Sequence, residues 1–199
     1  MEHRARIGKG TVLLPGTRIQ GETTIGENCT IGPQAVVNAC TVEDGVVINA
    51  SQVNESTLGE GCDVGPYAHI RPNCTVGPHC HIGAFVQLKN CVLGEGTQMA
   101  HLTYVGDADV GSRVNFGCGT ITTNYDGFQK FRCTIDDDAF IGCNTNLVAP
   151  VHVGAGSYIA AGATITKDVP QDARAVARAK QENKDGWAKR RRRMHGKDS

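Results

Sequence analysis

The stretch VGPYAHIRPNCTVGPHCHIGAFVQL, residues 64–88, places a branched aliphatic residue at every sixth position. A helix would scatter every sixth residue around its axis, and a single half-buried strand alternates every second residue. Neither period accounts for this spacing, so the stretch indicates a repeat with a unit of six residues. The aliphatic positions are Val64, Ile70, Val76, Ile82 and Leu88.

The same interval of six recurs on both sides of this stretch. A glycine often follows the aliphatic residue, and a small residue stands four positions after it, which is typical of a flat face joined to a tight corner. Three such units make a triangular coil whose aliphatic side chains point inward and stack on the next coil. The sequence therefore predicts an all-β fold, a left-handed parallel β-helix of hexapeptide repeats, over residues 1–169. Further aliphatic positions are Ile7, Leu13, Ile19, Ile25, Ile31 and Val37, and then Ile135, Ile141, Leu147, Val153, Ile159 and Ile165.

Three segments depart from the regular spacing. Between Val37 and Val64 the aliphatic residues come closer together, which indicates shortened corners in the same solenoid. Residues 123–133, TNYDGFQKFRC, lack the inward aliphatic residues and contain an Asp-Gly turn signal, so we expect a loop that projects from the prism. In residues 170–199 we expect a short helix over 172–183 that caps the solenoid, followed by an extended basic tail.

Composition narrows the class of protein. The chain has 40% hydrophobic but only 5% aromatic residues, so its core is built from branched and small side chains. The cysteines number nine and form no C-x-x-C pair, which argues against a disulfide framework or a zinc site. Cys29, Cys62, Cys74 and Cys80 fall in the small-residue slot and are expected to be buried. With no long apolar run and no signal-like start, we expect a cytoplasmic protein that binds no membrane.

The net charge of zero conceals an asymmetry. Residues 1–169 carry 10 Lys and Arg against 16 Asp and Glu, whereas residues 170–199 carry 10 against 4. The four consecutive arginines at 190–193 are not interleaved with aromatic residues, so nucleic acid is not an expected partner. A solvated tail, or one that contacts anionic groups of a ligand, fits this pattern better.

Chemistry-bearing residues gather within one part of the repeat. A lone histidine would most simply fill a corner, but His101 is accompanied by polar side chains up to Lys130 and by two cations on earlier coils. An imidazole titrates near neutral pH and suits a base that takes a proton from an amine, while Arg and Lys suit a phosphate. The glycine-rich corner at 117–119 offers backbone N–H groups to an oxyanion. The accompanying residues are Tyr104, Asn115, Asn124 and Tyr125, with Arg71 and Lys89 on the earlier coils.

Several motifs resemble the acetyltransferase half of the bacterial bifunctional N-acetylglucosamine-1-phosphate uridyltransferase/glucosamine-1-phosphate acetyltransferases. They are HLTYVGDADVG at 101–111, NFGCGTITTNYDGFQKF at 115–131 and NTNLVAPVHVGAGSYIAAGATITKDV at 144–169, with RPN at 71–73, FVQLKN at 85–90 and RAKQENKDGW at 178–187. The resemblance implies acetyl transfer from acetyl-CoA to the 2-amino group of glucosamine 1-phosphate, on the way to UDP-N-acetylglucosamine. It also implies a homotrimer with active sites between subunits and no required metal. Nothing before the first repeat resembles the uridyltransferase domain, so this chain alone is not expected to make the UDP-sugar.

The resemblance also implies a role for each candidate residue. His101 is the general base, and Arg71 and Lys89 bind the sugar phosphate. Three further residues complete the sugar site, and two residues of the projecting loop line both the sugar and the acetyl-CoA. The sugar-site residues are Tyr104, Asn115 and Lys130, the loop residues are Asn124 and Tyr125, and the remaining acetyl-CoA contacts are Cys118, Cys143, Ala161 and Arg178.

Departures from the family pattern keep alternatives open. Gln87 stands where the family usually has an acidic residue, which removes a carboxylate partner for His101 and keeps open a non-catalytic trimerising solenoid. Cys118 and Cys143 replace the usual Ala and Ser, so a covalent acetyl-cysteine route is a second alternative. Another amino-sugar or hydroxyl acceptor is a third. A metal enzyme similar to the γ-class carbonic anhydrases is a fourth, and its ligands would be His79, His81 and His101.

Overall fold

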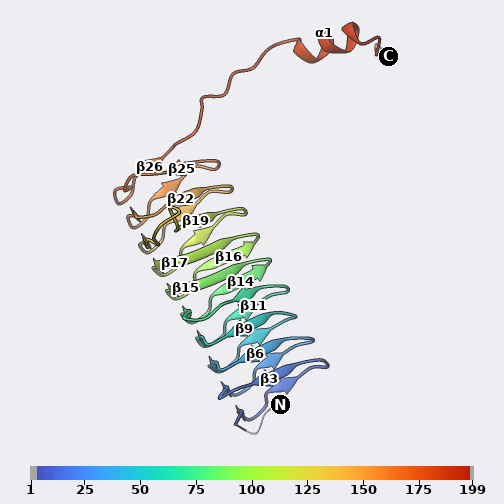
Figure 1. Ribbon diagram of the computed structural model, residues 1–199, viewed down its shortest axis with the longest axis vertical. Coiled ribbons are helices and arrows are strands. Elements are labelled where there is room, and N and C mark those ends of the chain that lie inside the picture. The colour runs from blue at the N-terminus through green and yellow to red at the C-terminus, as the bar shows by residue number, and fades with distance from the viewer. Residues whose placement is uncertain (1–3, 198–199) are drawn as a thin grey trace.

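Short strands recur along the chain, and each pairs in parallel with the strand one turn earlier and one turn later, as Figure 1 shows. This computed structural model describes residues 4–197. The strands form a 16-stranded and a 10-stranded sheet that wrap a common interior. The parallel β-helix of hexapeptide repeats predicted from the sequence is confirmed.

The 10-stranded sheet makes one face of the prism along its whole length. Its strands, in spatial order, are β2 (Val12–Leu13), β5 (Thr30–Ile31), β8 (Val47–Ile48), β11 (Asp63–Val64), β14 (His81–Ala84), β16 (Gln98–His101), β18 (Asn115–Phe116), β21 (Phe140–Ile141), β24 (Tyr158–Ile159) and β26 (Arg174–Ala175).

The 16-stranded sheet covers the other two faces, because its longest strands, β15 and β17, run around a corner. Its strands, in chain order, are β1 (Arg6–Ile7), β3 (Arg18–Gln20), β4 (Thr24–Ile25), β6 (Val36–Asn38), β7 (Thr41–Val42), β9 (Gln52–Asn54), β10 (Thr57–Leu58), β12 (His69–Ile70), β13 (Thr75–Val76), β15 (Gln87–Leu93), β17 (Tyr104–Val110), β19 (Ile121–Thr123), β20 (Cys133–Ile135), β22 (Asn146–Val148), β23 (Val151–Val153) and β25 (Thr164–Ile165).

The pairing register gives the length of each turn. Arg6 pairs with Thr24, 18 residues later, whereas Thr24 pairs with Thr41 after 17 residues and Thr41 with Thr57 after 16. These shorter turns fall where the sequence predicts shortened corners. The inward ladder stays in register through them, because Ile25, Val42 and Leu58 still pair directly.

The interior of the prism consists of the inward aliphatic residues and the small residues between them. Many large aliphatic side chains are fully buried, and burial of each contributes about 1.5–3 kcal/mol. The cysteines predicted to be buried, Cys29, Cys62, Cys74 and Cys80, are buried, and all nine cysteines are free thiols. The large buried side chains include Ile19, Ile25, Ile31, Ile48, Leu58, Ile70, Ile82, Leu88, Leu93, Met99, Ile135, Ile141, Leu147 and Ile159.

The predicted loop leaves the prism between β19 and β20. Asp109 pairs with Thr134, so this turn takes 25 residues, whereas the preceding turn, from Val92 to Asp109, takes 17. Residues 124–132 hold the excess. The Asp126 carboxylate accepts the N–H groups of Phe128 and Gln129, both at 2.8 Å, and closes the turn that the Asp-Gly pair signals.

The C-terminal predictions need two corrections. The prism does not end at residue 169, because β26 pairs with β24 and extends it by another partial turn. Residues 172–183 form no helix, because the N–H groups of Tyr158 and Ala160 on the last full turn bind the carbonyl oxygens of Ala173 and Ala175, which keeps this backbone extended. The chain then leaves the prism, and its helix, α1 (Trp187–Met194), contains the arginines predicted to be extended tail (Figure 1).

No helix within residues 4–197 is long and apolar enough to cross a membrane.

Candidate active site

Four of the predicted site residues lie in one column along a corner of the prism. Met99, Phe116, Ile141 and Ile159 are in register on neighbouring turns. The residue two positions after each therefore occupies the same place on its turn. These residues are His101, Cys118, Cys143 and Ala161, so the predicted base and three predicted acetyl-CoA contacts lie side by side on four successive turns.

His101 ends β16 with an exposed side chain. The Thr103 hydroxyl donates to its backbone carbonyl oxygen at 3.1 Å, which fixes the main chain at the corner. Within residues 4–197 the imidazole itself makes no hydrogen bond or ion pair, and no hydrogen bond joins it to Gln87, which is half-buried on β15. Both ring nitrogens are therefore open to a ligand.

The backbone of the next turn narrows the choice of oxyanion donor. The N–H of Gly117 donates to the carbonyl oxygen of Ile141 at 2.7 Å, and that of Gly119 donates to Leu102 at 2.9 Å. Both glycine donors expected from the sequence are therefore occupied. Among the described residues, the N–H of Cys118 has no partner, and it lies in the same column as His101.

The predicted phosphate-binding cations lie together at the other end of the next face. Ile70 pairs with Leu88, so Arg71 and Lys89 stand in register on neighbouring turns. Lys130 reaches this pair from the projecting loop, and contact with the Lys89 ammonium lowers the pKa of Lys130. Arg71 adds to this lowering through its own charge. An anion bound here would relieve the repulsion.

A buried carboxylate joins these cations to the loop. Asp107, on β17, is 5% exposed and is the only buried carboxylate within residues 4–197. It accepts from the Lys89 ammonium at 3.5 Å, from the Asn90 amide at 2.5 Å and from the Asn124 amide. Burial raises the pKa of Asp107, but the amide donors and the Lys89 charge outweigh burial and hold that pKa below its ordinary value.

Sequence reasoning missed Asp107. The residue lies within one of the motifs quoted for the family resemblance, but it received no role. The available signal was an acidic residue between Gly106 and Ala108, in a repeat where neighbouring small residues face the interior. The repeat pattern shows that such a residue is unusual, but it does not predict its hydrogen-bond partners. These partners lie on the preceding turn and on the loop.

The projecting loop is fastened at both ends. Its first residue, the buried Asn124, donates to Asp107. Its last residue, Arg132, makes two hydrogen bonds to Asp109, at 2.5 and 3.0 Å. Between them, Tyr125 and Lys130 form an isolated antiparallel bridge, and the Tyr125 hydroxyl donates to the carbonyl oxygen of Gly127 at 2.6 Å. The exposed part of the loop thus has a defined shape.

Of the remaining predicted residues, Tyr104 lies near the cations and two others lie apart from them. Tyr104 is half-buried at the start of β17, in register with Gln87, and interacts electrostatically with Lys89. Asn115 is exposed on β18, in the 10-stranded sheet, and so occupies a different face from Lys89. Arg178 is exposed beyond β26, with its Cδ atom beside Gly162, the residue after Ala161.

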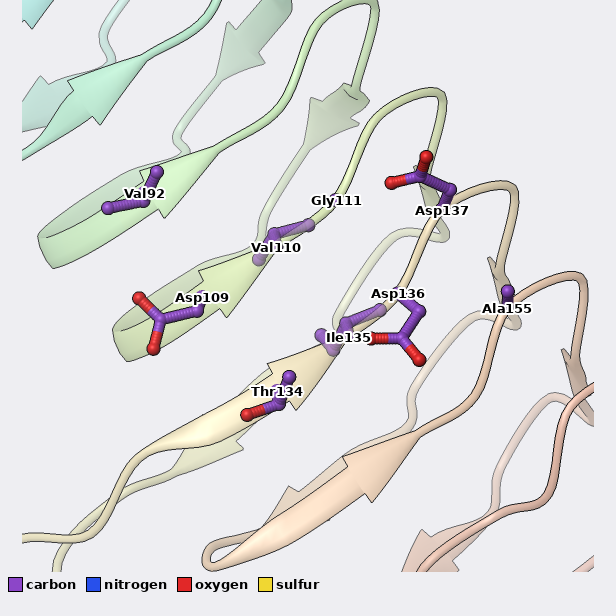
Figure 2. Close-up of a pocket in the computed structure, with 9 residues that line it drawn as sticks. All are labelled: Val92, Asp109, Val110, Gly111, Thr134, Ile135, Asp136, Asp137 and Ala155. Carbon is purple, nitrogen blue, oxygen red and sulfur yellow. The ribbon is translucent and has the colours of Figure 1, made fainter.

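A separate hollow lies on the face below the loop, and Figure 2 shows its lining. Its walls include Val92, Thr134 and three aspartates, and none of the predicted site residues lines it. Each of these aspartates forms an ion pair, in chain order with Arg132, His152 and Arg113, and the third also accepts the N–H of Ser112 at 2.8 Å. The aspartates are Asp109, Asp136 and Asp137.

Within residues 4–197, no group of three or more His, Cys, Asp or Glu side chains is arranged to hold a metal ion. His81, one of the histidines considered for a metal site, lies instead within 3.0 Å of the Asp63 carboxylate.

A parallel solenoid of six-residue repeats places this chain in the class of hexapeptide-repeat proteins. Its polar groups gather at one corner and on one loop. The chain belongs to the bacterial transferase hexapeptide family, whose six-repeat description matches residues 4–39, 55–90 and 132–167.

Two curated relatives illustrate how much of a longer protein this chain matches. The chain is 50% identical over 184 residues to a bifunctional protein GlmU from Exiguobacterium, which covers 92% of this chain and 41% of that protein. It is 48% identical over 199 residues to the bifunctional protein GlmU of Brevibacillus brevis, which covers 100% of this chain and 43% of that protein. The chain thus spans about two fifths of the length of these relatives.

Among solved structures, the Arabidopsis UDP-N-acetylglucosamine acyltransferase matches with a TM-score of 0.50 and 14% identity, over 85% of this chain and 66% of that one. At this level of identity the match concerns the fold alone.

Proposed function

We propose that this chain is an acetyltransferase that moves acetyl from acetyl-CoA to the 2-amino group of glucosamine 1-phosphate. The observation that carries the proposal is the corner column, in which an unpaired histidine stands beside an unpaired backbone N–H. The cation group formed by Arg71, Lys89 and Lys130 supplies the anion site that a sugar phosphate needs. The identity of about 50% to bifunctional GlmU proteins supports the same assignment.

In the proposed reaction, His101 takes the proton from the substrate amine as the amine nitrogen attacks the thioester carbonyl carbon. General base catalysis of this kind contributes about 10² to 10⁴ in rate. The carbonyl oxygen gains negative charge, which the free N–H of Cys118 stabilises. The C–S bond then breaks, and CoA leaves as the thiolate.

The phosphate group fixes the acceptor. Arg71 provides a planar fork, and the two lysines provide point charges, so together they hold a phosphate monoester and orient the sugar. The acetyl-CoA contacts are Cys118, Cys143 and Ala161 along the column, together with Arg178. Tyr104 and Asn115 complete the sugar site, and Asn124 and Tyr125 line both the sugar and the acetyl-CoA.

We further propose that the chain works as a homotrimer, with each site formed between subunits. Asn115 and Lys89 lie on different faces of one prism, and α1 has no buried residue. A neighbouring chain packed against the His101 corner would bring these separated groups around one substrate.

The test is to incubate the purified chain with acetyl-CoA and glucosamine 1-phosphate and to detect the N-acetylated sugar phosphate by mass spectrometry. The His101→Ala variant should lose about 10² to 10⁴ in turnover while keeping its fold, since the ring has no partner to lose. His152→Ala is the matched control, because His152 is also exposed and, within residues 4–197, its ring pairs with the surface Asp136 alone. Near-normal turnover in the His101 variant would contradict the assigned base, and absence of product from the folded wild type would contradict the acceptor.

A further inference from the structure

Asp107 is buried next to Lys89 and the start of the 124–132 loop, the parts of the proposed site that would bind the sugar phosphate. Its neighbours on β17 are small, and its backbone adopts a left-handed conformation with φ of 50°. Asp is among the few residues that tolerate this conformation. In this position the Asp107 carboxylate accepts hydrogen bonds from the Asn90 amide of the preceding turn and from the Asn124 amide of the loop.

The partners of Asp107 include one cation of the proposed phosphate site and the first residue of the loop that carries another. Oδ2 accepts from Lys89, the cation on β15, and from Asn124, the first residue of the loop that carries Lys130. Oδ1 accepts from Asn90, and the Asn90 carbonyl oxygen in turn accepts from Arg132 at 3.1 Å at the far end of the loop. One buried carboxylate therefore connects the cation of the body with both ends of the loop.

Charge gives Asp107 a second effect. Arg71, Lys89 and Lys130 interact within one small region, and their repulsion lowers the pKa of Lys130. Asp107 is the only carboxylate in salt-bridge contact with any of these three cations within residues 4–197. It offsets one positive charge of three, and the remaining charge matches a phosphate monoester, which carries about two negative charges near neutral pH.

We propose that Asp107 is a positioning residue for the acceptor, which fixes the Lys89 ammonium and the base of the 124–132 loop so that they receive the sugar phosphate in one geometry. Asp107 touches neither substrate. Its larger effect is expected on the acceptor side, because it bonds to Lys89 directly and makes no hydrogen bond with the acetyl-CoA column from Cys118 to Ala161. This inference rests on the proposed function for the identity of the acceptor. The ordering of the loop by Asp107 does not depend on which acceptor the chain uses.

The test compares Asp107→Asn with the wild type in two measurements. Asn keeps the shape and tolerates positive φ but removes the charge. In steady-state kinetics, the KM for glucosamine 1-phosphate should rise about tenfold or more, and the KM for acetyl-CoA should change less than about twofold. In hydrogen–deuterium exchange, the amides of residues 124–132 should exchange about tenfold faster, with the rest of the prism unchanged.

Asp138→Asn is the matched control. Asp138 also has positive φ, 59°, and also pairs with a cation, Arg113, through two hydrogen bonds at 2.7 and 2.8 Å. It is exposed, and its side chain makes no hydrogen bond or ion pair with Lys89, Asn90 or Asn124. This variant should match the wild type in both KM values and in loop exchange.

Each outcome decides the proposal. Unchanged loop exchange in Asp107→Asn, or equal increases in the two KM values, would overturn it. If the wild type acetylates no glucosamine 1-phosphate, the proposed function fails, and loop exchange alone still decides whether Asp107 orders the loop. If Asp107→Asn does not fold, Asn90→Gly replaces it, because glycine accepts the φ of 47° at this position and removes one donor to Asp107. That variant should change loop exchange in the same direction, and wild-type exchange there would refute the proposal.

Discussion

Replacement of Leu88 by alanine tests the stacking that holds the prism together. Leu88 is fully buried on β15 and lies in register between Ile70 on the turn before and Val105 on the turn after. The substitution removes three carbon atoms from a close-packed ladder. The lost transfer free energy is about 2.4 kcal/mol, at about 0.8 kcal/mol per carbon, and the residual cavity adds to it. We expect the free energy of unfolding to fall by about 3 to 5 kcal/mol.

The assay is urea unfolding followed by far-ultraviolet circular dichroism, with all variants at one protein concentration because association shifts apparent stability. Ile121→Ala is the control, since Ile121 is 43% exposed on β19 and is expected to change stability by less than about 0.5 kcal/mol. A loss below about 1 kcal/mol for Leu88→Ala would refute the reasoning, because the inward ladder would then not be the main source of stability.

Three further predictions concern the thiols, pH and the tail. Iodoacetamide should label Cys143 and Cys118 in the folded protein, whereas Cys133, whose pKa burial raises to about 11, should react only after unfolding, as peptide mass spectrometry would show. Since the pKa of Asp107 is lower in the folded chain than its unfolded value of about 3.9, its stabilising effect is complete above that pH and is lost as the pH falls through the folded value. Acid unfolding of Asp107→Asn should lack this component, and an unchanged acid transition would contradict it. A chain that stops after Ala177 should lose only the helical contribution of α1 to its circular dichroism spectrum and keep its melting temperature, because residues 178–197 are exposed. It should bind acetyl-CoA more weakly in calorimetry once Arg178 is removed. Unaltered acetyl-CoA affinity would remove Arg178 from the proposed site.

The sequence reveals which residues are candidates for the active site, but it does not reveal how they are arranged in space. The motif from His101 to Lys130 is legible in the sequence because its polar residues interrupt a regular aliphatic pattern. Their relative positions are not legible there. Whether Cys118 stands above His101 depends on the number of residues in each turn, and this number varies from 16 to 25 along the chain.

The sequence by itself determined the repeat, the inward ladder, the burial of cysteines such as Cys62 and the position of the projecting loop. These features follow from spacing along the chain, because a unit of six residues fixes which side chains point inward. Only the tertiary structure decided that β26 continues the prism, that Cys118 keeps a free N–H, and that Asp107 joins Lys89 to Asn124. The pairing of β26 and the contacts of Asp107 depend on hydrogen bonds between residues about 16 to 18 positions apart, and the N–H of Cys118 is free because the backbone pairing between turns leaves it without an acceptor. All three are set only when successive turns stack in register.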